Sequence, residues 1–168
     1  MAKSEIALRP LEEKDASRML EWLNDTEVTK YLNIKGGISK LEDSLSFIRT
    51  AKKEDFNLHR AIVGKDDVYL GTISLKNIDS KKQEAEYAIV MHPAAQGTGA
   101  AFAASELIID YAFSTMGLSR IYLYVEERNE RALKLYYKLG FIYTHSTSAK
   151  VEDKDFKYLW LEISKSNY

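Results

Sequence analysis

The sequence predicts one mixed α/β domain of the α+β kind, with helices packed on a single, mostly antiparallel twisted sheet. Three observations support this fold class. Strand and helix patterns both occur along the whole chain, strand-like runs outnumber helical ones, and a hairpin signal precedes the longest apolar helix. We expect about seven strands flanked by four helices. No repeat, linker or low-complexity segment divides residues 1–168, and this length suits one domain.

The first two elements are a strand and a helix. Residues 5–9 alternate apolar and polar side chains, which is typical of a strand, and Pro10 ends it. Residues 12–24 carry apolar side chains at helical spacing, so we expect a helix there. The segment 26–31 is predicted as a loop in which the helix could continue.

A second helix is predicted after a break in the chain. Gly36-Gly37 interrupts the pattern, and residues 40–52 then show helical periodicity. Ser39 is followed by Glu42 at the spacing of a capping box, so Ser39 is the expected N-cap.

An antiparallel meander of three strands is expected next. Residues 59–63 and 68–76 are rich in strand-forming side chains and flank a turn signal at 64–67. A polar turn at 79–82 leads into residues 84–91, where apolar side chains alternate with charged and small ones.

The remaining elements follow from the same two periodicities. The central helix is expected to begin within the turn around Gly99 and to end at Gly117, which caps it. The later elements, in chain order, are a buried strand at 121–125, a helix at 129–138 capped by Asn129 and ended by Gly140, and strands at 141–147 and 156–163.

A glycine-rich loop joins the strand at 84–91 to the central helix. Glycines let the backbone turn so that several N–H groups point the same way, and the first amides of a helix lack partners within it. Such a nest of donors at the positive end of a helix binds phosphate. The alternative is a tight turn that simply needs small residues. The loop comprises Gln96, Gly97, Thr98, Gly99, Ala100 and Ala101.

Composition excludes several classes of function. The formal net charge is -1 and the pI is about 6.3, so neither nucleic acid nor an anionic membrane is an expected partner. The chain has no cysteine, which rules out disulfides, thiolate metal sites and a cysteine nucleophile. The histidines lack the spacing of metal ligands, so no metal site is expected. Because no signal-peptide or membrane-spanning pattern occurs, we expect a cytoplasmic protein.

Two motifs together resemble the GNAT superfamily of acetyl-CoA-dependent N-acyltransferases. The first is the strand, the His-Pro-x-x-Gln-Gly-x-Gly-x-Ala segment at 92–101 and the helix that follows. The second is VEERNERALKLYYKLGF at 125–141, at the distance from the first that this family shows. The opening at 8–32 is similar to the RimJ/RimL-like branch of ribosomal-protein N-terminal acetyltransferases, which also includes spermidine and amino-sugar N-acetyltransferases.

The resemblance implies acetyl-CoA as the acyl donor. In this family the pyrophosphate of coenzyme A lies on backbone amides of the loop, and the pantetheine pairs with the preceding strand as an added strand would. The sheet opens between that strand and the one at 122–125 to make room. Many relatives carry Lys or Arg where this chain has Thr98, so phosphate binding is expected to depend more on the backbone than on charge. The implied cofactor-binding residues are Ile89, Val90, Met91, Gln96, Gly97, Thr98, Gly99, Ala100, Ala101 and Asn129.

The chemistry of amine acylation sets three requirements. The amine must lose its proton, the oxyanion needs hydrogen-bond donors, and the leaving thiolate gains from a proton donor. The resemblance assigns the last role to Tyr136 and the oxyanion to the amide near Ile89. The alternatives are a core aromatic for Tyr136 and a plain N-cap for Asn129.

Glu86 is the first choice for the base that receives the amine proton. By alternation Glu84 shares its strand face, so we expect an acidic face that attracts a cationic amine; a solvated strand face is the ordinary alternative. Tyr124 stands where some relatives use a carboxylate, which leaves Glu86 preferred and Glu126 and Glu127 as fallbacks.

The acceptor is the part that the sequence determines least. The resemblance places its recognition on the first helix and its loop, so Trp22, Asn24 and Tyr31 are candidates together with Glu84, although Trp22 is better suited to the core and Tyr31 is equally suited to either role. We expect an N-acetyltransferase that acts on a primary amine of a peptide N-terminus, a polyamine or an amino sugar by direct attack in a ternary complex. The alternative is a non-catalytic acyl-CoA-binding sensor or interaction module. Relatives also suggest a homodimer through the last strands.

Overall fold

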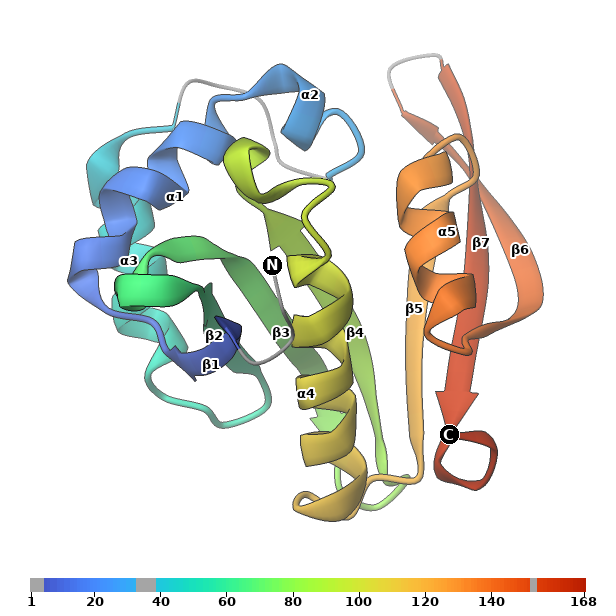
Figure 1. Cartoon of the computed structure of the whole chain (residues 1–168). Coiled ribbons are helices and arrows are strands. Elements are labelled where there is room, and N and C mark those ends of the chain that lie inside the picture. Colours follow the sequence, from blue (N-terminus) through green and yellow to red (C-terminus); the bar gives the residue numbers. More distant parts are fainter. Residues whose placement is uncertain (1–4, 33–38, 152–153) are drawn as a thin grey trace.

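A computed structural model of the chain describes residues 5–32, 39–151 and 154–168, which form one seven-stranded sheet with helices on both faces (Figure 1). The strands are β1 (Ala7–Pro10), β2 (Leu58–Val63), β3 (Tyr69–Asp79), β4 (Glu84–Met91), β5 (Arg120–Glu126), β6 (Ile142–Val151) and β7 (Lys154–Ser164). The helices are α1 (Ala16–Leu23), α2 (Thr26–Thr29), α3 (Leu41–Ala51), α4 (Ala100–Ser114) and α5 (Glu130–Lys138).

The sheet is mixed and mostly antiparallel, as predicted. Its strand order is β1-β2-β3-β4-β5-β7-β6, and β4 and β5 are the parallel pair. Four main helices flank it, and the one-turn helix α2 lies in the segment where helical continuation was left open. No helix within the described ranges is long and apolar enough to cross a bilayer.

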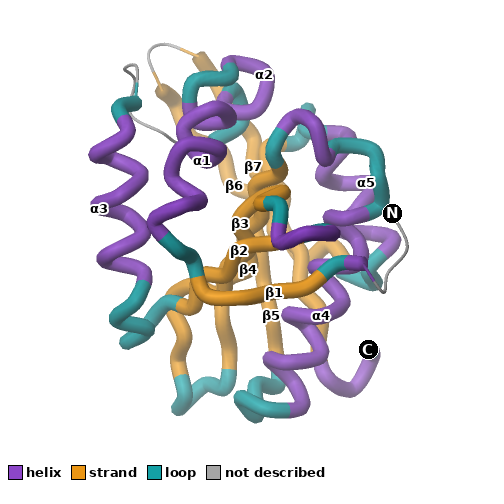
Figure 2. Tube along the Cα trace, turned by 60° about the vertical axis from the view of Figure 1, so that its left-hand side comes forward, coloured by secondary structure: helices purple, strands orange, loops and turns teal. Residues whose placement is uncertain are grey.

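Two hydrophobic clusters lie on opposite faces of the sheet. One packs α4 and α5 against most of the strands and includes Ile73, Ile109 and Leu123. The other packs α1 and α3 against β2 and β3 and includes Met19 and Ile48. Figure 2 shows α1 and α3 on one side of the sheet and α4 and α5 on the other. The first half of the sheet is therefore covered on both faces.

The parallel pairing of β4 with β5 ends early. Only three residue pairs are in register, namely Glu84 with Arg120, Ala85 with Ile121 and Glu86 with Tyr122. Both strands lie wholly within the described residues and continue for several residues beyond this point without pairing to each other. The sheet therefore opens between them, as the resemblance implied, and leaves backbone groups there without a partner in the sheet.

The N-cap predicted for the second helix was wrong. The N-cap of α3 is Lys40, whose N–H donates to the Asp43 carboxylate at 2.6 Å, because Ser39 is held one residue earlier by a hydrogen bond to Asn24. The predicted break at Gly36-Gly37 lies outside the described residues.

The strand at 121–125 was predicted to be buried, but this strand, β5, is buried on only one of its two faces. Ile121, Leu123 and Val125 are buried, whereas Tyr122 is half-buried and Tyr124 is 45% exposed. The reason is that α4 and α5 lie against one face of this half of the sheet, while α1 and α3 pack on the strands of the other half.

Candidate active site

The loop after β4 adopts the backbone that its glycines permit. Gly97 and Gly99 have φ angles of 75° and 85°, a left-handed conformation that side chains rarely adopt. A Cβ atom at either position would meet nothing within 4 Å, so the space above the loop is open. The amides of Gly97, Gly99 and Ala101 donate no hydrogen bond to the backbone carbonyl of another described residue. Free donors around open space at the start of α4 fit a pyrophosphate group.

A cation that the sequence pattern did not reveal lies beside this loop. Arg131, in the first turn of α5, donates a hydrogen bond from Nη1 to Oε1 of Gln96. The Thr98 hydroxyl donates to the carbonyl of Ala95 at 2.7 Å and so shapes the turn. Arg131 thus brings a positive charge to the loop even though position 98 has none. The sequence feature that could have pointed to Arg131 is its position two residues after Asn129, in the first turn of the helix.

Tyr136 points from α5 into the core between the two halves of the sheet. Its ring centroid lies 5.8 Å from that of Tyr87 on β4 and 6.0 Å from that of Phe141. Burial raises the pKa of Tyr136, so the hydroxyl keeps its proton at neutral pH. The Tyr87 hydroxyl is paired with Ser105 at 2.6 Å, whereas the Tyr136 hydroxyl makes no hydrogen bond within the described part of the chain. It is therefore available as a donor.

Asn129 is the N-cap of α5. Its Oδ1 atom accepts a hydrogen bond from the N–H of Ala132 at 3.3 Å, which is the structural alternative considered for it. Tyr136 lies two helical turns further along α5, as its spacing predicted. Contact of Asn129 with the cofactor stays a prediction.

Glu86 is 8% exposed, and both of its carboxylate oxygens have partners. Oε1 lies 2.8 Å from Nζ of Lys76, and Oε2 accepts a hydrogen bond from Nδ2 of Asn77 at 2.8 Å. Asn77 has φ of 50° beside a register shift between β3 and β4, a bulge that turns its side chain toward β4. A base at this position would have to exchange the Lys76 contact for the amine or for a water molecule.

The expected acidic face of β4 is wrong as stated, because cations from neighbouring strands balance it. Glu84 lies 3.4 Å from Nη1 of Arg120 and 4.0 Å from Nζ of Lys82. Together with the Lys76 pair described above, these cations neutralise the two glutamates. Alternation along β4 correctly placed Glu84 and Glu86 on one face, but it could not identify the residues across the strands.

The three acceptor candidates lie in different environments. Trp22 is 7% exposed and donates its indole N–H to the Tyr69 hydroxyl at 3.1 Å, so it is a core residue and we do not retain it as a substrate contact. Asn24 exchanges two hydrogen bonds with the backbone of Ser39 and so fastens the end of α1 to the start of α3. Tyr31 is half-buried and donates to the carbonyl of Arg128 at 3.2 Å, so it reaches the turn that precedes α5.

A buried histidine joins α1 to the start of the loop, and the sequence did not single it out. His92 is 6% exposed, and its Nε2 lies 2.6 Å from the Glu21 carboxylate. Its Nδ1 accepts from the N–H of Ala94 at 3.2 Å, which assigns the proton to Nε2. Arg18 of α1 lies 3.5 Å from the same Nδ1. These contacts position the segment between β4 and the glycine loop.

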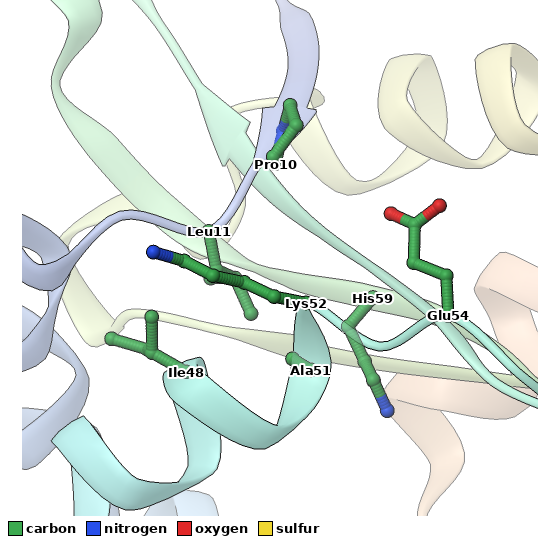
Figure 3. Close-up of a pocket in the computed structure, with 7 residues that line it drawn as sticks. All are labelled: Pro10, Leu11, Ile48, Ala51, Lys52, Glu54 and His59. Carbon is green, nitrogen blue, oxygen red and sulfur yellow. The ribbon is translucent and has the colours of Figure 1, made fainter.

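One cavity lies away from this constellation, whereas a second adjoins it, because Asn77, the partner of Glu86, lines it together with Phe56, Ile78, Asp79, Ser80 and Lys81. The first, between α3 and the strands β1 and β2, has a volume of about 10 Å³, enough for roughly one water molecule, and its lining residues are drawn in Figure 3. It is lined by Pro10, Leu11, Ile48, Ala51, Lys52, Glu54 and His59. Among the described residues no three His, Asp or Glu side chains converge in a way that could hold a metal ion.

Comparison with known proteins gives a consistent match. The family described as an acetyltransferase (GNAT) domain matches residues 5–142. The chain is similar to spermidine N(1)-acetyltransferase of Escherichia coli strain K12, with 31% identity over 141 residues that cover 81% of this chain and 72% of that protein. It also resembles the crystal structure of a Vibrio cholerae spermidine N-acetyltransferase in complex with CoA and spermine, with a TM-score of 0.88, 22% identity and 98% of both chains covered. A dodecameric structure of the Vibrio cholerae enzyme matches with a TM-score of 0.79 at 20% identity, covering 98% of this chain and 96% of that one.

Proposed function

The chain belongs to the GNAT acetyltransferase family, and from this premise we propose that it transfers the acetyl group of acetyl-CoA to a primary amine of a linear polyamine. The observation that carries the proposal is the early end of the β4–β5 pairing beside a loop of free amides, because it provides both a phosphate site and an open strand edge. The similarity to spermidine acetyltransferases favours a polyamine over the other amines considered.

The acyl donor is expected to bind along the opened edge of β4. The amides of Gly97, Gly99 and Ala101, with Arg131 beside them, would hold the pyrophosphate. The backbone of residues 89–91 would pair with the pantetheine amides, since the opposite edge of β4 is already paired with β3. Acetyl-CoA supplies the acetyl group as a thioester. The N–H near Ile89 would donate to the carbonyl oxygen as negative charge develops on it.

Proton removal from the ammonium falls to Glu86. It lies on β4 at the last residue pair before the strands separate, so it is next to the opening. Lys76 and Asn77 fix its carboxylate, and an incoming ammonium would compete with Lys76 for the same oxygen. Glu86 would then accept the amine proton directly or through a water molecule.

Tyr136 would act on the leaving sulfur. Its hydroxyl has no competing partner among the described residues, and its ring packs edge-to-face with that of Tyr87, the neighbour of Glu86 on β4. The pKa of a tyrosine is already above that of an ordinary thiol, and burial raises the pKa of Tyr136 further, so full proton transfer to the thiolate is unfavourable. A strong hydrogen bond to the developing charge is the contribution that we assign to it.

Thiol release from acetyl-CoA against a panel of amines tests the proposal. The panel holds spermidine, spermine, peptides with varied N-termini, aminoglycosides and amino sugars. We expect turnover with spermidine and spermine and a far slower reaction with the rest. A peptide as the best acceptor would contradict the polyamine assignment while keeping the acetyltransferase. Acetyl-CoA binding without turnover on any amine would favour the non-catalytic sensor.

Assembly belongs to the same proposal. A related spermidine acetyltransferase is dodecameric, and we infer that this chain also forms oligomers. Light scattering at several protein concentrations measures this, and a monomer throughout the range would contradict it.

A further inference from the structure

A row of aromatic side chains lies on the face of β5 and β7 opposite α5. Consecutive ring centroids are 6.1, 5.2, 5.9 and 6.4 Å apart. The ring of Tyr124 is at its centre and is 45% exposed. We call this row the aromatic strip; its members, in order, are Tyr122, Trp160, Tyr124, Tyr158 and Phe156.

The two ends of the strip already bind cations. The guanidinium of Arg120 lies over the Tyr122 ring at 5.4 Å, and that of Arg128 lies over the Phe156 ring at the same distance. The electron-rich faces of aromatic rings attract such groups. Within the described residues no cation lies over Tyr124, in the middle of the strip. The centre of the strip is therefore suited to a cation from outside the chain.

A buried carboxylate oxygen without a partner lies at the Phe156 end of the strip. Glu126 is 4% exposed, and its Oε1 is 2.6 Å from Nε of Arg128, the residue that also covers Phe156. Its Oε2 is buried and accepts no hydrogen bond from any described residue. Glu126 shares the strand face of Tyr124 by alternation and lies opposite Tyr158 in the β5–β7 register.

A hydrogen-bond donor would stabilise this unpaired oxygen of Glu126. A buried acceptor that lacks a hydrogen bond costs free energy, and the cost is greater when the group is charged. An alkylammonium group would fit both the unpaired oxygen and the uncovered rings. Its N–H groups would donate hydrogen bonds to the carboxylate, while its charge and methylene groups would lie against the aromatic faces. Arg128 covers Glu126 with a side chain that is 63% exposed, so it can move aside for a competing cation.

We propose that Glu126 and the central rings of the aromatic strip bind the non-reacting ammonium end of a linear polyamine. This inference rests on the proposed function and names the acceptor site. From Glu126 the strip follows β5 to Tyr122, roughly 13 Å away at about 3.3 Å per residue. Tyr122 is paired with Glu86, the proposed base, so a chain anchored at Glu126 leads its other amine to the opening. The polyamine uses the face of β5, whereas the acyl donor uses the edge of β4.

Charge near Tyr122 supports this path. Burial, together with the negative charges of Glu86 and Glu84, raises the pKa of Tyr122. Lys76 and Arg120 pair with these two carboxylates, so an incoming ammonium would compete with them for the carboxylate oxygens. The strip therefore runs from one carboxylate to another across aromatic rings.

Isothermal titration calorimetry with spermidine tests the site directly. Glu126→Gln keeps the shape of the side chain and removes its charge, and Tyr124→Leu removes the exposed ring. We expect each to weaken spermidine binding at least tenfold and to raise the KM for spermidine more than it lowers kcat. Glu130→Gln, an exposed glutamate four residues later, and Tyr143→Leu, a 52% exposed tyrosine on β6, are the matched controls and should bind as the parent protein does.

Two results would overturn the inference. One is unchanged spermidine binding in both Glu126→Gln and Tyr124→Leu with melting temperatures near that of the parent protein. The other is absence of spermidine binding by the parent protein, whichever amine proves to be the acceptor. In the first case, dissociation of a dimer by Tyr124→Leu would assign the strip to a second copy of the chain. Failure of the proposed function is separate, because it would appear as no acetyl transfer to any amine of the panel.

Discussion

The two halves of the sheet are built from similar strands but are covered differently. The half formed by β1–β4 is enclosed by α1 and α3 on one face and by α4 on the other. The half formed by β5–β7 has α5 on one face and the aromatic strip on the other. Figure 1 shows the two halves diverging between β4 and β5. The enclosed half can hold a rigid backbone, while the half with one open face can present side chains to a ligand.

The proposed chemistry needs a contribution from each half. The first half supplies Glu86 and the glycine loop, and the second supplies Tyr136, Arg131 and the strip. Since only three residue pairs join the halves at β4 and β5, small shifts between them would change the alignment of the reacting groups. Substitutions in each half should therefore separate proton removal, thiolate stabilisation and donor binding.

The largest expected effect is that of Glu86→Gln in the first half. Loss of a general base typically lowers the rate by a hundredfold or more, so we expect kcat for spermidine to fall by about that factor with little change in acetyl-CoA affinity. Steady-state kinetics on both substrates measures this. Glu84→Gln, on the same strand face but paired with Arg120, should cost far less. Equal losses in the two variants would remove Glu86 from the mechanism.

Tyr136→Phe tests the contribution of the second half. A hydrogen bond to a charged group is worth about 1.5–3 kcal/mol, which corresponds to a loss in kcat of roughly tenfold to a hundredfold. Because the hydroxyl makes no hydrogen bond to another described residue, the substitution should leave stability and acetyl-CoA binding nearly unchanged. Unaltered kcat with saturating substrates would assign Tyr136 to the core alone.

A smaller effect is expected from Gly99→Ala at the loop. The left-handed φ of 85° strains any residue with a Cβ atom, and that atom would enter the open space of the phosphate site. We expect about tenfold weaker acetyl-CoA binding, measured by calorimetry. Gly117→Ala, at φ of 71° beyond the other end of α4, carries a similar strain and should lower stability alone. Similar losses of affinity in both variants would argue against a phosphate site at Gly99.

The smallest effect concerns the dependence of stability on pH. Tyr136 has a raised pKa in the folded protein, whereas in the unfolded chain it ionises near pH 10. The contribution of the buried, protonated Tyr136 to the free energy of unfolding is therefore complete below about pH 10. It is lost as the pH rises above that value, because the unfolded state then releases the proton more readily than the folded state does. Urea midpoints of Tyr136→Phe should fall less steeply above pH 10 than those of the parent protein. Tyr143→Phe, which changes an exposed tyrosine, is the control, and identical slopes in all three proteins would contradict this account.

The sequence by itself determined the local elements. The period-2 pattern predicted β4 with its observed bounds, and the glycines of the loop form the predicted turn because glycine readily adopts the positive φ angles found there. The spacing of Asn129 and Tyr136 likewise predicted α5, with Asn129 as its cap. Interactions of this kind lie within a few residues of chain, so periodicity, capping and turn chemistry are enough to predict them.

Only the tertiary structure decided which side chains meet across the sheet. Lys76 and Arg120 neutralise the two glutamates of β4, and Arg131 reaches Gln96 from a helix 35 residues away. The aromatic strip forms because β7 inserts next to β5, ahead of β6, so residues more than thirty positions apart become neighbours. These contacts depend on strand order and register, which are set by the packing of the whole domain and leave no periodic trace in the sequence.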